Sequence, residues 1–131
     1  MSALTILYVE DNELNRKIVR DLLRHTAYHL IEAHDGEAGV AVALDKRPDL
    51  ILMDIQLPKI SGLDATRRLR AEPGTKATPI IALTSFALSG DDSRAIEAGA
   101  TAYLAKPYSP FELLGLIRKI LPEVAPTEAG R

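Results

Sequence analysis

The sequence predicts a three-layer α/β sandwich, in which a parallel β-sheet lies between two layers of helices. Short, almost continuously apolar runs alternate with longer amphipathic stretches along the whole chain. Strands without polar alternation are typical of a sheet that is covered on both faces. The 131 residues suit one domain with a single core.

Five apolar runs are the expected strands. Most are rich in Ile, Leu and Val, and the second is the weakest of them. They lie at residues 4–9, 28–33, 49–53, 79–83 and 102–105.

The first helix is expected to begin after Asn12, a good N-cap, and to extend to about His25. Its periodicity predicts one buried and one exposed face. The expected buried residues are Ile18, Val19, Leu22 and Leu23, and the expected exposed ones are Arg16, Lys17, Arg20, Asp21 and Arg24.

The other four helices are bounded by residues that cap or stop helices. Pro48 limits the second helix, because the residue before a proline resists the helical conformation. Ser61 and Ser109 cap the third and fifth helices, and Gly99 ends the fourth. The expected ranges are 36–46, 61–71, 89–98 and 109–121.

Strict alternation of strands and helices restricts the topology. Crossovers between parallel strands are right-handed, which leaves the flavodoxin-like strand order 2-1-3-4-5 as the leading choice. Residues 1–122 are expected to form this domain, and residues 123–131, with a proline and a glycine, to form a disordered tail.

Composition excludes several classes of protein. The chain has no cysteine, which rules out disulfides and thiolate metal sites. It has no apolar stretch near the ~20 residues of a membrane span and no signal-peptide pattern at its start. Its net charge of −2 argues against direct binding of nucleic acid. These features fit a cytoplasmic protein without membrane insertion.

Polar side chains gather at the predicted carboxyl ends of the strands. Glu10 and Asp11 follow the first strand, Asp54 ends the third, Thr84 ends the fourth and Lys106 follows the fifth. In a doubly wound sheet the functional site lies outside this edge, at the switch between strands 1 and 3. The sequence therefore places three carboxylates, a hydroxyl and an ammonium together.

This group of side chains suits phosphoryl chemistry. Three crowded carboxylates repel one another unless a cation intervenes, and oxygen ligands favour a hard cation such as Mg²⁺. A carboxylate beside such an ion can attack phosphorus and form an aspartyl phosphate. Lys106 can supply counter-charge and Thr84 a hydroxyl to the phosphoryl oxygens.

Each residue also has a plainer interpretation. Asp11 can be only a helix cap, Glu10 a solvated loop charge, and Thr84 with Ser85 the cap of a turn. Asp54 is the hardest to explain in this way, because a carboxylate that ends the most apolar strand must be solvated, paired or functional. The joint placement of these residues, rather than any single one, favours a functional site.

The motifs resemble those of the receiver domains of two-component response regulators, over residues 4–121. The stretches 9–15, 50–62 and 86–90 are most similar to free-standing, single-domain regulators of the DivK type. The matching motifs are Tyr8-Val9-Glu10-Asp11-Asn12, Leu52-Met53-Asp54-Ile55-Gln56-Leu57-Pro58, Gly62-Leu63, Ala82-Leu83-Thr84-Ser85, Gly99-Ala100 and Lys106-Pro107.

The resemblance implies a role for each matching residue around Asp54, which corresponds to the phosphoacceptor. Asp11 would bind Mg²⁺ directly, Glu10 would bind it largely through water, and the backbone carbonyl of Gln56 would complete the protein ligands. Thr84 would donate a hydrogen bond to the phosphoryl group.

Three further positions follow from the same resemblance. Lys106 would pair with the phosphoryl group, and its bond to Pro107 is expected to be cis. Tyr103 matches an aromatic ring that changes orientation as Thr84 moves. Ser85 departs from the family pattern, in which alanine is frequent.

The implied function is to receive a phosphoryl group from a sensor histidine kinase or phosphotransfer protein, followed by slow hydrolysis, rather than turnover catalysis. The chain ends about ten residues after the fifth helix, so we expect the signal to pass to another protein through the helix 4–strand 5–helix 5 face. A homodimer is also compatible. The stripe of Arg16, Arg20 and Arg24 on the first helix is either a kinase-docking surface or a solvated face.

Three alternatives stay open at this point. A flavin protein would share the fold, but the acidic Glu10-Asp11 pair would repel its phosphate. A Mg²⁺-dependent phosphohydrolase with an aspartate nucleophile would place two aspartates differently around the first strand. The chain can also be a receiver domain from a larger hybrid histidine kinase.

Overall fold

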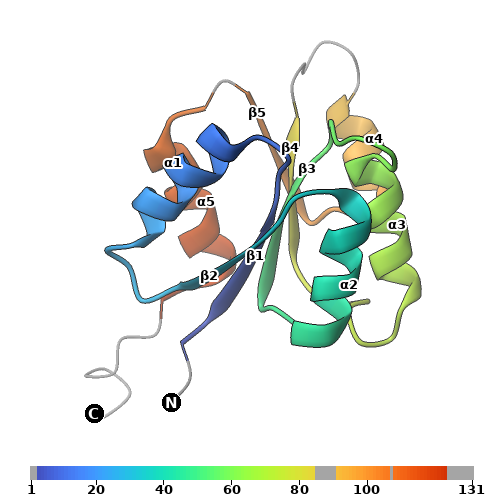
Figure 1. The fold of residues 1–131 in the computed structure, drawn as a ribbon, viewed down its shortest axis with the longest axis horizontal. Coiled ribbons are helices and arrows are strands. Elements are labelled where there is room, and N and C mark those ends of the chain that lie inside the picture. The colour runs from blue at the N-terminus through green and yellow to red at the C-terminus, as the bar shows by residue number, and fades with distance from the viewer. Residues whose placement is uncertain (1–2, 85–90, 107, 124–131) are drawn as a thin grey trace.

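The computed structural model describes residues 3–84, 91–106 and 108–123, and within them it shows the predicted three layers (Figure 1). Helices α1 and α5 cover one face of the sheet, and α2, α3 and α4 cover the other. The strands are β1 Thr5–Val9, β2 His29–Ala33, β3 Leu50–Asp54, β4 Ile80–Thr84 and β5 Ala102–Ala105; the helices are α1 Glu13–Leu23, α2 Gly36–Lys46, α3 Gly62–Ala71, α4 Asp91–Ala98 and α5 Pro110–Ile120.

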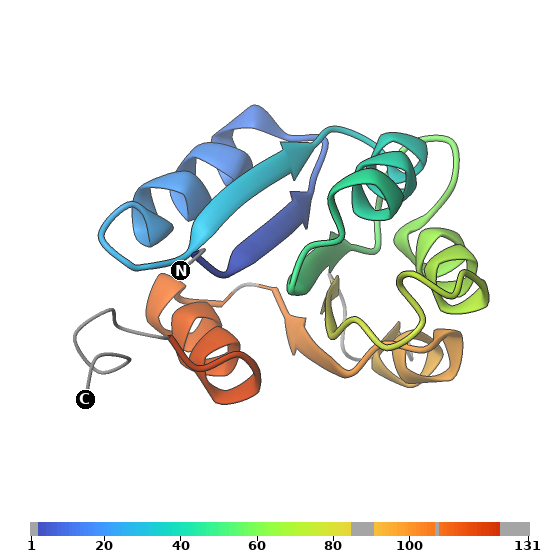
Figure 2. The ribbon, with the colours of Figure 1, turned by 90° about the horizontal axis from the view of Figure 1, so that it is seen from below.

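The described strands form one parallel sheet in the order β2-β1-β3-β4-β5, which confirms the predicted fold. Figure 2 shows the two helix layers on opposite sides of the sheet, with α1 and α5 on one side and α2, α3 and α4 on the other. The chain places β2 on one side of β1 and then β3, β4 and β5 on the other side, so the switch in strand order lies between β1 and β3. Polar residues at the carboxyl ends of these two strands therefore flank the switch point, where doubly wound folds hold their ligands.

Two apolar cores fill the two faces of the sheet. Side chains alternate across a strand, so Ile6 and Leu52 face α1 and α5, whereas Leu7 and Met53 face α2 and α3. All residues of β3 and β4 are buried, as the near-continuous apolar runs predict.

Most helix starts agree with their predicted caps. The side chains of Asn12, Ser61 and Ser109 each accept a hydrogen bond from the backbone N–H three residues later. Ser109 also forms a reciprocal capping box with Glu112. Asp35 caps α2, a cap that the sequence analysis did not identify. The expected start of the fourth helix at residues 89–90 lies outside the described residues.

The predicted faces of α1 are wrong at two positions. Ile18 is 46% exposed, whereas Arg16 is only 6% exposed. The Arg16 guanidinium lies against the start of the helix, where Nη1 donates to the backbone carbonyl of Glu10 at 2.7 Å and Nη2 donates to Glu13 at 2.7 Å. The exposed basic stripe of the prediction therefore lacks Arg16.

The C-terminal segment continues past α5 in contact with the domain. The Glu123 carboxylate accepts hydrogen bonds from the Ala27 N–H and from Arg118, each at 2.8 Å. The rest of the predicted tail, residues 124–131, lies outside the described residues. Within the described part of the chain, none of the helices has the length and apolar character needed to cross a bilayer.

Candidate functional site

Three carboxylates meet where β1 and β3 end. Tyr8 lies opposite Leu52 in the parallel ladder, so Glu10 and Asp54, each two residues further on, lie on the same face. Glu10 and Asp54 are buried, at 1% and 2% exposure, and Asp11 is exposed. One carboxylate oxygen from each of the three lies within 4.8 Å of the others. The structure thus brings together the predicted acidic residues.

Asp54 is held at both of its carboxylate oxygens. Oδ1 accepts a hydrogen bond from the backbone N–H of Gln56 at 3.0 Å, and Oδ2 accepts one from Lys106 Nζ at 3.0 Å. Gln56 therefore lies in the loop beside the acidic group. The role of the Gln56 backbone carbonyl as a metal ligand stays a prediction.

Lys106 reaches the site from the end of β5 and lies between two carboxylates. Its Nζ is 3.0 Å from Asp54 Oδ2 and 3.6 Å from Glu10 Oε1. Burial alone would lower the pKa of Lys106, but the charge and hydrogen bond of Asp54, with the charge of Glu10, raise this pKa above its usual value. The side chain is therefore a permanent cation at neutral pH.

Thr84 ends β4, next to the strand that carries Asp54. Its side chain is fully buried, and among the described residues its Oγ1 has no hydrogen-bond partner. A buried hydroxyl without a partner needs an explanation, because leaving it unpaired costs about 1–3 kcal/mol. A ligand oxygen that enters the site would supply that partner.

Tyr103 lies on β5, the neighbour of β4, and its side chain is 42% exposed. It pairs with Ala82, while Ala105 pairs with Thr84. The predicted placement of Thr84 and Tyr103 on adjacent strands is thus present. Ser85 and Pro107 lie outside the described residues, so the Ser85 departure and the cis bond stay predictions.

Two residues that hold Glu10 were not identified as site residues from the sequence. Tyr8 donates its hydroxyl to Glu10 Oε1 at 3.1 Å, and Asn15 Nδ2 donates to the same oxygen at 3.3 Å. The backbone N–H of Asn12 donates to Oε2 at 3.3 Å. The spacing of Tyr8 and Glu10 along the chain contains a signal for their contact, because residues i and i+2 of a strand share a face.

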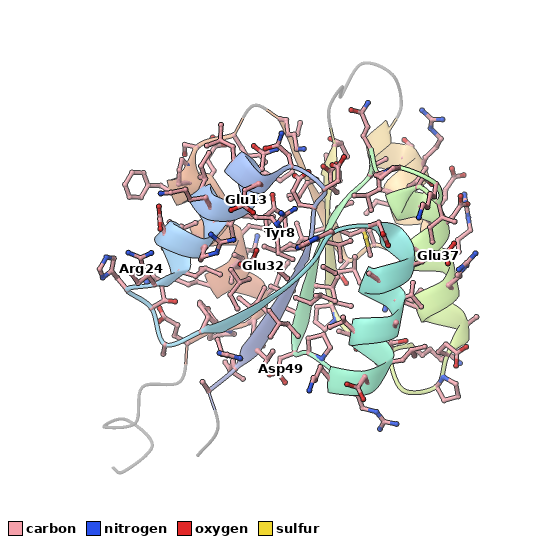
Figure 3. All side chains as sticks on the ribbon, viewed as in Figure 1. Tyr8, Glu13, Arg24, Glu32, Glu37 and Asp49 are labelled. Carbon is pink, nitrogen blue, oxygen red and sulfur yellow. The ribbon has the colours of Figure 1, made fainter. Side chains whose placement is uncertain are left out.

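The Tyr8 ring is fully buried beneath α1, toward the upper end of the sheet in Figure 3. Burial, followed by the nearby Tyr108 and Glu10, raises the pKa of Tyr8 far above its ordinary range. Tyr8 is therefore a neutral hydrogen-bond donor. It also lines a pocket of about 350 Å³ between α1 and the start of α5, together with Asn15, Lys106 and Tyr108.

The loop after β3 is pressed against the end of that strand. A Cβ atom on Gly62, the first residue of α3, would clash with the backbone oxygen of Asp54. Only glycine permits this approach. The Gly62 N–H also donates to the Ile55 carbonyl at 2.9 Å, so the start of α3 fixes the backbone that carries Asp54.

A doubly wound parallel sheet with three carboxylates at its switch point is the arrangement expected of a signalling receiver domain. Residues 6–118 match the family model of the response regulator receiver domain, and the chain belongs to that family. The chain is a response regulator of two-component signalling, rather than a classical enzyme.

Named relatives are similar over nearly their whole length. The polar-differentiation response regulator DivK of Brucella anthropi is 42% identical over 117 residues, which cover 89% of this chain and 95% of DivK. A putative response regulator from Chloroflexus aurantiacus superposes with a TM-score of 0.85 at 34% identity, covering 90% of this chain and 97% of that structure. The chain is therefore a DivK-like receiver domain.

A third relative bears on the metal. The receiver domain of the sensor histidine kinase PA1611 from Pseudomonas aeruginosa PAO1 superposes with a TM-score of 0.83 at 40% identity. The match covers 89% of this chain and 96% of that structure, which contains a magnesium ion coordinated in its active-site cleft. In the present structure, two buried carboxylates and one exposed carboxylate offer only oxygen donors. This donor set fits a hard divalent cation.

Proposed function

We propose that the chain accepts a phosphoryl group on Asp54 and passes the signal on by binding another protein. The observation that supports this most strongly is the setting of Asp54. This buried carboxylate at the switch point is paired with Lys106 at 3.0 Å and lies within reach of the Glu10 and Asp11 carboxylates. A structural ion pair would not need two further acids beside it, since they repel Asp54.

The proposed donor is a phosphohistidine on a sensor histidine kinase or a phosphotransfer protein. An Asp54 carboxylate oxygen forms a bond to phosphorus while the P–N bond of the donor breaks. The leaving imidazole nitrogen takes the electron pair of that bond, and a proton on the other ring nitrogen leaves the donor histidine neutral. In the later hydrolysis, water attacks phosphorus and the bond to Asp54 breaks, which restores the carboxylate and releases inorganic phosphate. The kinase draws its phosphoryl group from ATP, so the proposal places this exchange in the cytoplasm.

The chain's own residues have separate parts in this transfer. Lys106 holds Asp54 before transfer and would pair with a phosphoryl oxygen afterwards. Asp11, Glu10, Asp54 and the Gln56 carbonyl are the proposed holders of Mg²⁺, which when bound neutralises the charge on the phosphoryl oxygens.

Thr84 and Tyr103 are the proposed switch. The Thr84 hydroxyl has no partner among the described residues and would donate to a phosphoryl oxygen. Movement of Thr84 would leave space for the half-exposed Tyr103 ring on the adjacent strand. We propose that the α4–β5–α5 face, which includes Tyr103, then binds the downstream protein or a second copy of the chain.

The experiment is to measure the intact mass after incubation with a small acyl phosphate, with and without Mg²⁺. The wild-type protein is expected to gain one phosphoryl group only with Mg²⁺, and hydroxylamine, which cleaves acyl phosphates, is expected to remove it. The Asp54→Asn variant is expected to gain none, because an amide oxygen is a poor nucleophile.

The matched control is Asp45→Asn, which makes the same change at an exposed residue of α2. It should gain the phosphoryl group as the wild type does. A wild-type protein that gains no group, or an Asp54→Asn variant that gains as much as the control, would show that Asp54 is not the acceptor.

A further inference from the structure

Two buried carboxylates compete for the ammonium of Lys106. Nζ lies 3.0 Å from Asp54 Oδ2 but 3.6 Å from Glu10 Oε1, so it rests on Asp54. Glu10 is as buried as Asp54 and needs donors of its own. Neutral groups supply them, since the Tyr8 hydroxyl and the Asn15 amide both donate to the oxygen of Glu10 that faces Lys106.

Tyr8 is the more deeply buried of these two donors. Its side chain is fully buried in the core beneath α1, whereas Asn15 is only partly buried in the first turn of that helix. Tyr108 lines the same pocket as Tyr8, and the Tyr8 hydroxyl donates to Glu10 Oε1 at 3.1 Å.

We propose that Tyr8 is a positioning residue that keeps the Glu10 carboxylate directed at the cation site and leaves Lys106 to Asp54. The inference rests on the proposed function, since it concerns the same acidic site. Without the Tyr8 hydroxyl, Lys106 can move the short distance to Glu10 Oε1. The Lys106 ammonium would then neutralise the Glu10 carboxylate, which the cation needs. It would also no longer be paired with Asp54, the proposed acceptor.

The test uses Mn²⁺ as the probe and measures binding from the loss of its free electron paramagnetic resonance signal, with no phosphodonor present. Tyr8→Phe removes one oxygen atom and keeps the ring in the core. It is expected to weaken Mn²⁺ binding by about tenfold, the lower end of the effect of losing a partner that orients a metal ligand.

Tyr28→Phe is the matched control. Tyr28 is a buried tyrosine of the same core, and its hydroxyl donates to the Leu121 carbonyl rather than to the site. Loss of this hydrogen bond can lower the free energy of unfolding but should not change the affinity for Mn²⁺. Urea unfolding without metal checks that each variant is folded.

A double-mutant cycle separates positioning from a general loss of structure. If Tyr8 acts through the Glu10 carboxylate, then Tyr8→Phe should have no further effect on affinity when Glu10→Gln is already present. An unchanged affinity in Tyr8→Phe alone, or an equal loss in the Glu10→Gln background, would overturn the inference. Both results are independent of whether Asp54 accepts a phosphoryl group, so the two proposals fail separately.

Discussion

At the scale of single residues, the site depends on backbone contact as much as on charge. Asp54 owes its position to Gly62, because the start of α3 is packed directly on the Asp54 carbonyl. The three nearest atoms that a Cβ would meet at Gly62 belong to the backbone of Asp54 and Ile55. They cannot move aside as a flexible side chain would.

Gly62→Ala is therefore expected to lower the free energy of unfolding by about 2 kcal/mol or more, the usual range for an added group in a packed region. The measurement is urea unfolding at pH 7. Gly115→Ala is the control, because a Cβ at this position in α5 meets nothing within 4 Å. That variant should gain about 0.5–1 kcal/mol. Equal effects at the two glycines would contradict the packing argument.

The sequence was sufficient to predict which polar side chains gather at the site. Five polar residues end or follow a predicted strand, and the strand order places them at one edge of the sheet: Glu10, Asp11, Asp54, Thr84 and Lys106. The neutral residues around them were less predictable. The donation of Asn15 to Glu10 depends on how α1 leaves the sheet, which no local pattern specifies.

At the scale of elements, α1 is attached to β2 through arginine and glutamate. Arg20 donates two hydrogen bonds to the two carboxylate oxygens of Glu32, each at 2.8 Å. Arg16 Nε lies 3.4 Å from the same carboxylate. Helical periodicity assigned both arginines to solvent. It failed at Arg16, because periodicity places a Cα on a face but does not say where a long side chain reaches.

This connection predicts a pH dependence. The Arg20 hydrogen bond lowers the pKa of Glu32 in the folded protein below its ordinary 4.5. A carboxyl with a lowered folded pKa stabilises the protein above its unfolded pKa, and the stabilisation is lost as the pH falls through the folded value. Glu32→Gln is thus expected to cost about 1 kcal/mol at pH 7, and the difference from wild type should shrink below about pH 4.5.

The measurement is the urea midpoint of both proteins between pH 7 and pH 3. Glu37→Gln provides the control, because Glu37 is an exposed residue of α2 on the opposite side of the molecule (Figure 3). Its substitution should shift stability by no more than about 0.5 kcal/mol. A constant difference between wild type and Glu32→Gln across this pH range would exclude Glu32 as the titrating group.

At the scale of the whole molecule, cation binding should be visible as stability. A ligand that binds only the folded protein adds about 2.7 kcal/mol to the free energy of unfolding at one hundred times its dissociation constant. We expect Mg²⁺ to stabilise the wild type in this way. Asp11→Asn should lose most of the effect, since it removes one of the three clustered carboxylates.

The same variant should be slightly more stable than wild type without metal, because it relieves repulsion among those carboxylates. Asp45→Asn serves as the control and should respond to Mg²⁺ as the wild type does. Denaturation at constant ionic strength separates binding from screening. A Mg²⁺ response that is unchanged in Asp11→Asn would remove Asp11 from the proposed ligands.

The architecture itself was predictable because every level of the sequence agrees with it. Apolar runs, caps and helix stops all indicated the same alternation, and the observed strand order is the predicted one. The element boundaries differ by only one or two residues where the structure describes them.

The Thr84 hydroxyl, which has no hydrogen-bond partner among the described residues, has a consequence for the energy balance of signalling. A buried donor that is left without a partner costs about 1–3 kcal/mol. If a phosphoryl oxygen accepts that hydrogen bond, the cost disappears in the modified state alone. Part of the conformational bias would then come from pairing this hydroxyl, in addition to the charge that the phosphoryl group brings.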